Sequence, residues 1–151
     1  MDYQLKKGDL LYRTKGLVEH AGVYLGNAKV LHNSPVNNVE IVDLESFANR
    51  KALKVKETVL SDLNGFDKRL NELLSDNKRY EMLGCNCENT ANYLINGVSS
   101  SSQSVAGVLG GLLGAWLGST IEQKKLPVYI LGGAFIAIAI NNITRNYNHV
   151  A

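Results

Sequence analysis

The sequence predicts an α+β domain built on an antiparallel sheet, followed by an apolar, glycine-rich helical hairpin. Three observations lead to this prediction. Short segments in which polar and apolar residues alternate come first, and segments with apolar residues at helical spacing come later. The last third of the chain is almost free of charged residues. Strands that precede helices, instead of alternating with them, are typical of an antiparallel α+β fold.

Five short strands are expected in the first part of the chain, where Val, Leu and Tyr are frequent. The turns Lys15-Gly16 and Gly26-Asn27 separate the first three strands, and the tight second turn predicts a hairpin. The expected strands cover residues 9–14, 19–25, 28–33, 39–42 and 53–58.

Three helices are expected in the same part of the chain. A short helix over 44–49 lies between the fourth and fifth strands. Ser61 or Asp62 can cap a second helix that runs to about residue 76, because apolar residues follow at helical spacing. A third helix runs from near Asn86 to near Gly97. The apolar positions of the second helix are Leu63, Phe66, Leu70, Leu73 and Leu74.

The composition limits the possible functions and the compartment. The 151 residues carry 16 basic and 14 acidic side chains, which excludes a strongly cationic nucleic-acid binder. Two cysteines cannot form a disulfide framework, and Cys85 and Cys87 are too close in sequence for an easy bridge. The first residues contain no apolar run, so we expect no secretory signal and a thiol-reducing, cytoplasmic setting for the folded domain.

The start of the third helix carries a candidate nucleophile, Cys87. Asn86 is a favourable N-cap residue, so Cys87 falls in the first turn, where the helix dipole lowers the pKa of a thiol. The unpaired backbone N–H groups of that turn can also hold a developing oxyanion. The alternative is a small buried core residue, because Cys87 lies on the apolar face of the helix. That face comprises Cys87, Ala91, Leu94, Ile95 and Val98.

Two histidines on neighbouring strands are the candidate bases. Alternation puts His20, Gly22 and Tyr24 on one face of their strand, where Gly22 leaves room for a close neighbour. His32 closes the next strand, which the hairpin brings beside the His20 strand. One base and one orienting residue beside a thiol follow the logic of nucleophilic triads. Each histidine taken singly also fits a structural role, and His149 is discounted because it lies in a tail expected to fray.

A metal site is an alternative use of the same kinds of residue. Its ligands would be Cys85, Cys87, His20 and His32. The Cys-x-Cys spacing is poor for structural zinc, where two to four residues usually separate the cysteines. We therefore predict no metal and no cofactor.

Two uncharged segments in the last third of the chain predict membrane-associated helices. Residues 105–121 and 126–143 are each near the lower limit for spanning a bilayer, for which about 20 residues are typical. Small residues at four-residue spacing, such as Gly110, Gly114 and Gly118, let two helices approach closely. Their apolar neighbours would then face lipid. These neighbours are Val105, Leu109, Leu112, Leu113 and Trp116.

Two other arrangements of the apolar segments stay open. They can form a pair of buried core helices in the soluble domain. Alternatively, residues 126–143 alone span the membrane while residues 105–118 lie on its surface. The lysines of the connecting turn give no clear charge asymmetry, so the sequence does not fix the topology.

Several motifs stand in a recognisable order along residues 8–104. They are the segments Gly8-Asp9-Leu10-Leu11, Glu19-His20-Ala21-Gly22-Val23-Tyr24-Leu25-Gly26 and Val30-Leu31-His32, the box Asn86-Cys87-Glu88, and the spaced residues Tyr93, Gly97, Ser102 and Gln103. As an ordered set they resemble the lecithin:retinol acyltransferase-like family.

The resemblance implies a permuted papain-like fold of the NlpC type, with Cys87 as nucleophile, His20 as general base and His32 as the orienting third member. Members of that family move acyl groups through a thioester on the cysteine, usually from phospholipids, and many carry a C-terminal membrane anchor. The box departs from the family pattern at Asn89-Thr90, where His-Phe is usual. This departure leaves the substrate class open.

We therefore expect a catalytic domain over 1–98, a Ser-rich linker over 99–104, a membrane-anchoring hairpin over 105–143 and a tail over 144–151. The expected function is that of a membrane-associated thiol acyltransferase or phospholipase. Its partners would be a phospholipid acyl donor and the membrane, without nucleic acid. The alternatives are a papain-like cysteine peptidase or amidase, and a non-catalytic protein that acts on membranes through the hairpin.

Overall fold

A computed structural model of the chain describes residues 3–16, 18–76, 86–121 and 123–150. The chain divides into two compact units. The first contains most of residues 1–101 together with the last six residues, and the second contains residues 15–19 and 102–145. Each unit is described separately below.

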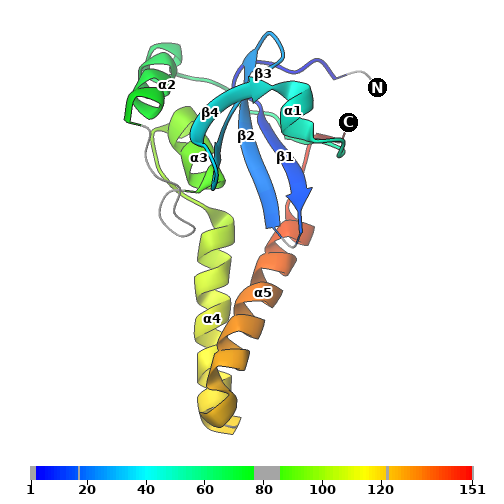
Figure 1. Cartoon of the computed structure of the whole chain (residues 1–151), viewed down its shortest axis with the longest axis vertical. Helices are drawn as coiled ribbons and strands as arrows, with labels where there is room; N and C mark the ends of the chain where they lie inside the picture. The colour runs from blue at the N-terminus through cyan, green and yellow to red at the C-terminus, as the bar shows by residue number, and fades with distance from the viewer. Residues whose placement is uncertain (1–2, 17, 77–85, 122, 151) are drawn as a thin grey trace. The chain divides into compact units, whose positions relative to one another are not determined.

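The first unit is built on an antiparallel six-stranded sheet (Figure 1). The strand order is β4-β3-β2-β1-β5-β6, so the first four strands form a meander. Asn27 and Ala28, with φ of 48° and 55°, make the tight turn between β2 and β3. The predicted antiparallel α+β fold is confirmed. The strands are β1 (Leu10–Lys15), β2 (Val18–Gly26), β3 (Lys29–Ser34), β4 (Asn38–Asp43), β5 (Lys54–Lys56) and β6 (His149–Val150).

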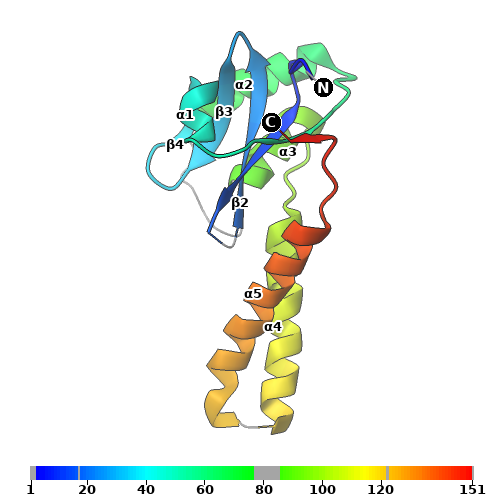
Figure 2. The ribbon, with the colours of Figure 1, turned by 90° about the vertical axis from the view of Figure 1, so that its right-hand side faces the viewer.

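Helices pack on both faces of the sheet, because alternation along each strand gives it two apolar faces. One core joins the Leu10, Ala21 and Leu31 face of the sheet to helices α2 (Leu63–Asp76) and α3 (Cys87–Asn96). The second core surrounds Phe47 of helix α1 (Leu44–Ala48), which contacts β3 and β4 (Figure 2). The catalytic candidates lie around these two cores.

Two sequence-based expectations at the ends of elements are wrong. Val98 is 63% exposed, because Gly97 adopts a left-handed conformation with φ of 73° and ends α3 before the apolar face reaches Val98. His149 does not lie in a frayed tail. It belongs to β6, which pairs with β5, and its Nε2 lies 2.7 Å from Glu57 Oε1. A two-residue strand has no periodicity from which it can be predicted.

The second unit is a pair of apolar helices, as predicted. They are α4 (Ser102–Ile121) and α5 (Leu126–Thr144), joined through the short helix η1 (Gln123–Lys125), and they lie side by side in Figures 1 and 2. Both are long and apolar enough to cross a membrane by length and composition. A Cβ at Gly110 would collide with the carbonyl oxygen of Gly133, so only glycine permits this approach.

The outer surface of the helix pair is apolar. The side chains expected to face lipid are all exposed, which is unlike the buried core helices of a soluble domain. Part of the expected linker is ordered, since α4 begins at Ser102 and both Ser101 and Gln103 are buried. The exposed apolar side chains include Val105, Leu109, Leu112, Leu113 and Trp116.

Candidate active site

Cys87 is the first residue of α3, as the sequence predicts. The side-chain oxygen of Asn86 accepts hydrogen bonds from the N–H groups of Glu88 and Asn89, both at 3.0 Å. This capping explains why the helix begins here. The same bonds occupy two of the N–H groups that the sequence led us to expect as unpaired oxyanion donors, so that expectation is wrong for Glu88 and Asn89.

The thiol of Cys87 is buried, with 8% of the residue exposed. Burial raises the pKa of this thiol, whereas backbone N–H groups, that of Ala21 foremost, act to lower it. The predicted lowering of the pKa by the helix dipole is therefore wrong, because removal of the sulfur from water outweighs the favourable backbone groups. A thiol in this environment is protonated at rest, so it needs a base to become a nucleophile.

His20 and His32 meet through their side chains. His20 Nε2 lies 2.9 Å from His32 Nδ1, and the two residues are 4% and 8% exposed. The antiparallel register pairs Gly22 with His32, which brings the third residue of β2 within reach of the fourth residue of β3. The hairpin between β2 and β3 thus makes the contact.

The side chain of Glu40, which the sequence did not single out, extends this chain. His32 Nε2 lies 3.3 Å from Glu40 Oε1, and the two residues are register partners on β3 and β4. The amide of Asn37 donates hydrogen bonds to both oxygens of Glu40, and the hydroxyl of Ser34 donates to one of them. The sequence does show a charged residue, Glu40, within the predicted strand over 39–42. Its contact with His32 could not be predicted, because that contact depends on the register between β3 and β4.

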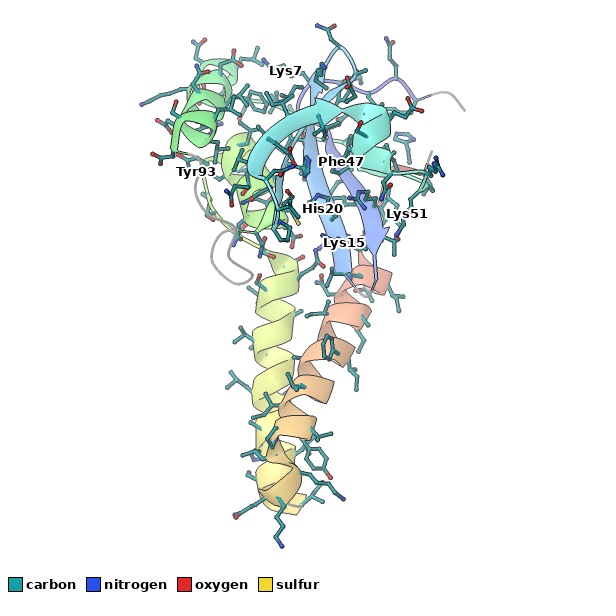
Figure 3. All side chains as sticks on the ribbon, in the orientation of Figure 1. Lys7, Lys15, His20, Phe47, Lys51 and Tyr93 are labelled. Atoms are coloured by element: carbon teal, nitrogen blue, oxygen red, sulfur yellow. The ribbon has the colours of Figure 1, made fainter. Side chains whose placement is uncertain are left out.

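The His20 and His32 rings both pack against Phe47. Their centroids lie 5.6 and 5.7 Å from that of Phe47, and Figure 3 shows His20 and Phe47 close together. A Cβ at Gly22 would lie 2.7 Å from Phe47 Cε2 and 2.7 Å from Val30 Cγ1. The close neighbours that Gly22 admits are therefore Phe47 and Val30.

The thiol of Cys87 contacts β2 at the residue next to His20. The backbone N–H of Ala21 hydrogen-bonds to the thiol of Cys87, and Ala21 directly follows His20 in the chain. Alternation puts Ala21 and His20 on opposite faces of the strand, so sulfur and imidazole come from the two sides of β2.

Arg13 is a second residue that the sequence did not single out. Its guanidinium carbon lies 5.7 Å from the centre of the Phe47 ring, and its charge interacts with Cys87. Burial lowers the pKa of Arg13, while the interaction with Cys87 raises it. The site thus also contains a partly buried cation on the Phe47 face of the sheet.

The described residues contain no group of three or more His, Cys, Asp or Glu side chains arranged to hold a metal ion. Cys85, a ligand in the zinc alternative, lies outside the described residues. The buried thiol and the two histidines in contact allow thiol chemistry with an imidazole base.

Residues 1–57 of the chain match the model of the NlpC/P60 family. The matched segment contains β1 to β5 with both histidines, and it ends before Cys87. NlpC/P60 proteins are papain-like cysteine hydrolases, so the match supports this superfamily and an enzymatic function. The α+β fold is consistent with it. No curated protein matches the chain.

Proposed function

We propose that this protein is a membrane-associated cysteine hydrolase or acyltransferase that forms an acyl thioester on Cys87. The supporting observation is the chain of contacts from His20 through His32 to Glu40, next to the strand position that bonds the thiol. Such a chain orients a base, which is what a protonated, buried thiol requires.

The contacts support one set of proton positions. The carboxylate of Glu40 can only accept, so we place the proton of His32 on Nε2, which faces it. The nitrogen of neutral His32 that accepts a hydrogen bond is then Nδ1. His20 must then carry its proton on Nε2 to donate to His32 Nδ1. The nitrogen of neutral His20 that accepts a proton is therefore Nδ1. This is the atom that we assign as the base for Cys87.

The reaction follows in two steps. The Cys87 proton moves to His20 Nδ1 while the sulfur attacks the acyl carbonyl, and the same nitrogen returns the proton to the departing oxygen or nitrogen. Water or another acceptor then attacks the thioester while His20 takes its proton. The carbon–sulfur bond breaks, the acyl product leaves, and the Cys87 sulfur regains the proton from His20. Glu40 stabilises the positive charge that the histidine pair carries between these transfers.

The helix pair supports a lipid donor at a membrane. Exposed Leu, Ile and Trp side chains on α4 and α5 match the hydrocarbon of a bilayer. A domain held there meets lipid acyl chains at a raised effective concentration. We therefore propose a phospholipid as the acyl donor and a cytoplasmic membrane surface as the location.

The test is turnover of mixed-phospholipid vesicles by the purified full-length chain, with lipid products identified by mass spectrometry. Wild type should release fatty acid or transfer an acyl group, and both Cys87→Ser and His20→Gln should be inactive. Cys85→Ser serves as the matched control and should stay active. Lipid turnover that survives Cys87→Ser but not Cys85→Ser would contradict the assignment of the nucleophile.

A cysteine peptidase or amidase is the second candidate, and the NlpC/P60 match favours it. It uses the same thiol and base on an amide instead of an ester. Inactivity toward lipids, together with Cys87-dependent cleavage of a peptide library, would favour this candidate. Labelling of neither cysteine by a thiol-directed acylating probe would instead favour a non-catalytic role for the helix pair.

A further inference from the structure

We propose that Arg13 is an anion-binding residue that holds the phosphate group of the acyl donor. The inference rests on the proposed function, because it concerns the substrate of Cys87. It names the residue that recognises the phosphate of the proposed phospholipid donor, and it gives β1 a role in recognition.

The first argument is the place of Arg13 in the sheet. The N–H of Tyr24 donates to the carbonyl of Asp9 at 2.9 Å, which sets the register between β1 and β2. Continued along the two antiparallel strands, this register places Arg13 opposite His20. Arg13 is therefore a cross-strand neighbour of the base, on the face of the sheet that Phe47 covers.

The second argument is that the guanidinium has no counterion among the residues that the structure describes. Arg13 is half-buried, and its buried Nε has no hydrogen-bond partner among the residues that the structure describes. Within the same described ranges, no carboxylate forms an ion pair with it. Arg69, in contrast, donates to the carbonyls of Leu94 and Ile95 and pairs with Asp62. A partly buried, unpaired charge is costly, and a bound anion removes that cost.

The third argument is chemical fit. A guanidinium presents a planar set of donors that matches two oxygens of a phosphate, which a lysine ammonium does not. The Phe47 ring covers one side of the guanidinium and limits its orientations. Arg13 and His20 both contact Phe47, so an anion bound to Arg13 lies in the neighbourhood of the base.

The first test measures local charge without a substrate. Alkylation of Cys87 is followed by mass spectrometry with anionic iodoacetate and with neutral iodoacetamide at one pH and low salt. Arg13→Gln should lower the ratio of the two rates by about fivefold or more, because a nearby cation attracts only the anionic reagent. Both reagents react with the thiolate of Cys87, so a change in the fraction of thiolate alters the two rates equally and leaves their ratio unchanged.

Lys15→Gln is the matched control, because it removes an exposed positive charge from the same strand and should change the ratio little. Arg13→Lys keeps the positive charge and should retain most of the ratio of the iodoacetate and iodoacetamide rates. A ratio that falls in Arg13→Gln but not in Arg13→Lys therefore reports the charge. A ratio in Arg13→Gln that changes no more than in Lys15→Gln would overturn the proposal.

The second test uses two donors with identical acyl chains, phosphatidylcholine and diacylglycerol, in detergent micelles. Arg13→Gln should raise KM for phosphatidylcholine about tenfold more than KM for diacylglycerol, which is the scale of one charge-assisted contact. Equal losses for both donors would overturn phosphate binding. If wild type turns over neither lipid, the proposed function fails and, with it, the phosphate as the ligand, whereas the alkylation ratio still reports whether Arg13 attracts anions.

Discussion

Replacement of Gly22 by alanine should disturb the site through Phe47. The new Cβ would lie 2.7 Å from atoms of both Phe47 and Val30, where ordinary contacts begin at 3.4 Å. Phe47 must therefore move by several tenths of an ångström, and the His20 and His32 rings pack on it. Overpacking of this kind costs about 1–3 kcal/mol in the free energy of unfolding. We expect that loss together with reduced activity.

The assay is urea unfolding in detergent, with a short pulse of thiol reagent and mass-spectrometric readout of the labelled fraction of Cys87. Phe47→Leu should relieve part of the clash, so the double variant should cost about 1 kcal/mol less than the sum of the single variants. Gly132→Ala, whose new Cβ meets no atom within 4 Å, is the control. Additive costs, or a stable and fully active Gly22→Ala variant, would refute the argument that Phe47 supports the histidines.

Three further predictions concern the base, the thiol and the helix pair. Glu40→Gln should lower kcat about 10-fold to 100-fold in the vesicle assay at an unchanged melting temperature, and an unchanged kcat would exclude an orienting role. Because burial raises the pKa of the folded Cys87 thiol, the unfolded chain loses that proton first as the pH rises above about 8.5. The free energy of unfolding should therefore fall more from pH 7 to pH 10 in wild type than in Cys87→Ala, and equal falls in urea titrations would contradict the raised pKa. Gly114→Leu should separate α4 from α5, because its Cβ would collide with the Tyr129 carbonyl, and the turn should then be cleaved faster by protease in micelles. Gly111→Leu is the control and should have a milder effect, since the atom nearest to its Cβ lies 3.7 Å away. Equal effects of the two variants would argue against close packing at Gly114.

The sequence predicts those parts of the site that depend on local chemistry. Asn86 is recognisable as a cap, so the start of α3 and the place of Cys87 follow from it. The tight turn after β2 predicts a hairpin, and the hairpin brings His20 and His32 into contact. These features need only neighbouring residues and the periods of helix and strand.

Features that depend on register or burial were not predictable. Glu40 meets His32 only because β3 and β4 pair in one register, and Arg13 meets Phe47 only through the packing of α1 on the sheet. The direction of the pKa shift of Cys87 was not predictable either, because it depends on burial. A helix dipole can be predicted from sequence, but the larger effect of burial depends on the whole core.

The central claim is that Cys87 carries an acyl group during turnover. The most direct measurement is the intact mass of the full-length protein after brief incubation with phospholipid vesicles and an acid quench, with the adduct mapped to its peptide. We predict one added acyl mass on Cys87 that hydroxylamine removes, and no such mass on Cys87→Ser. An adduct on another residue, or lipid turnover in the Cys87→Ser variant, would contradict the account.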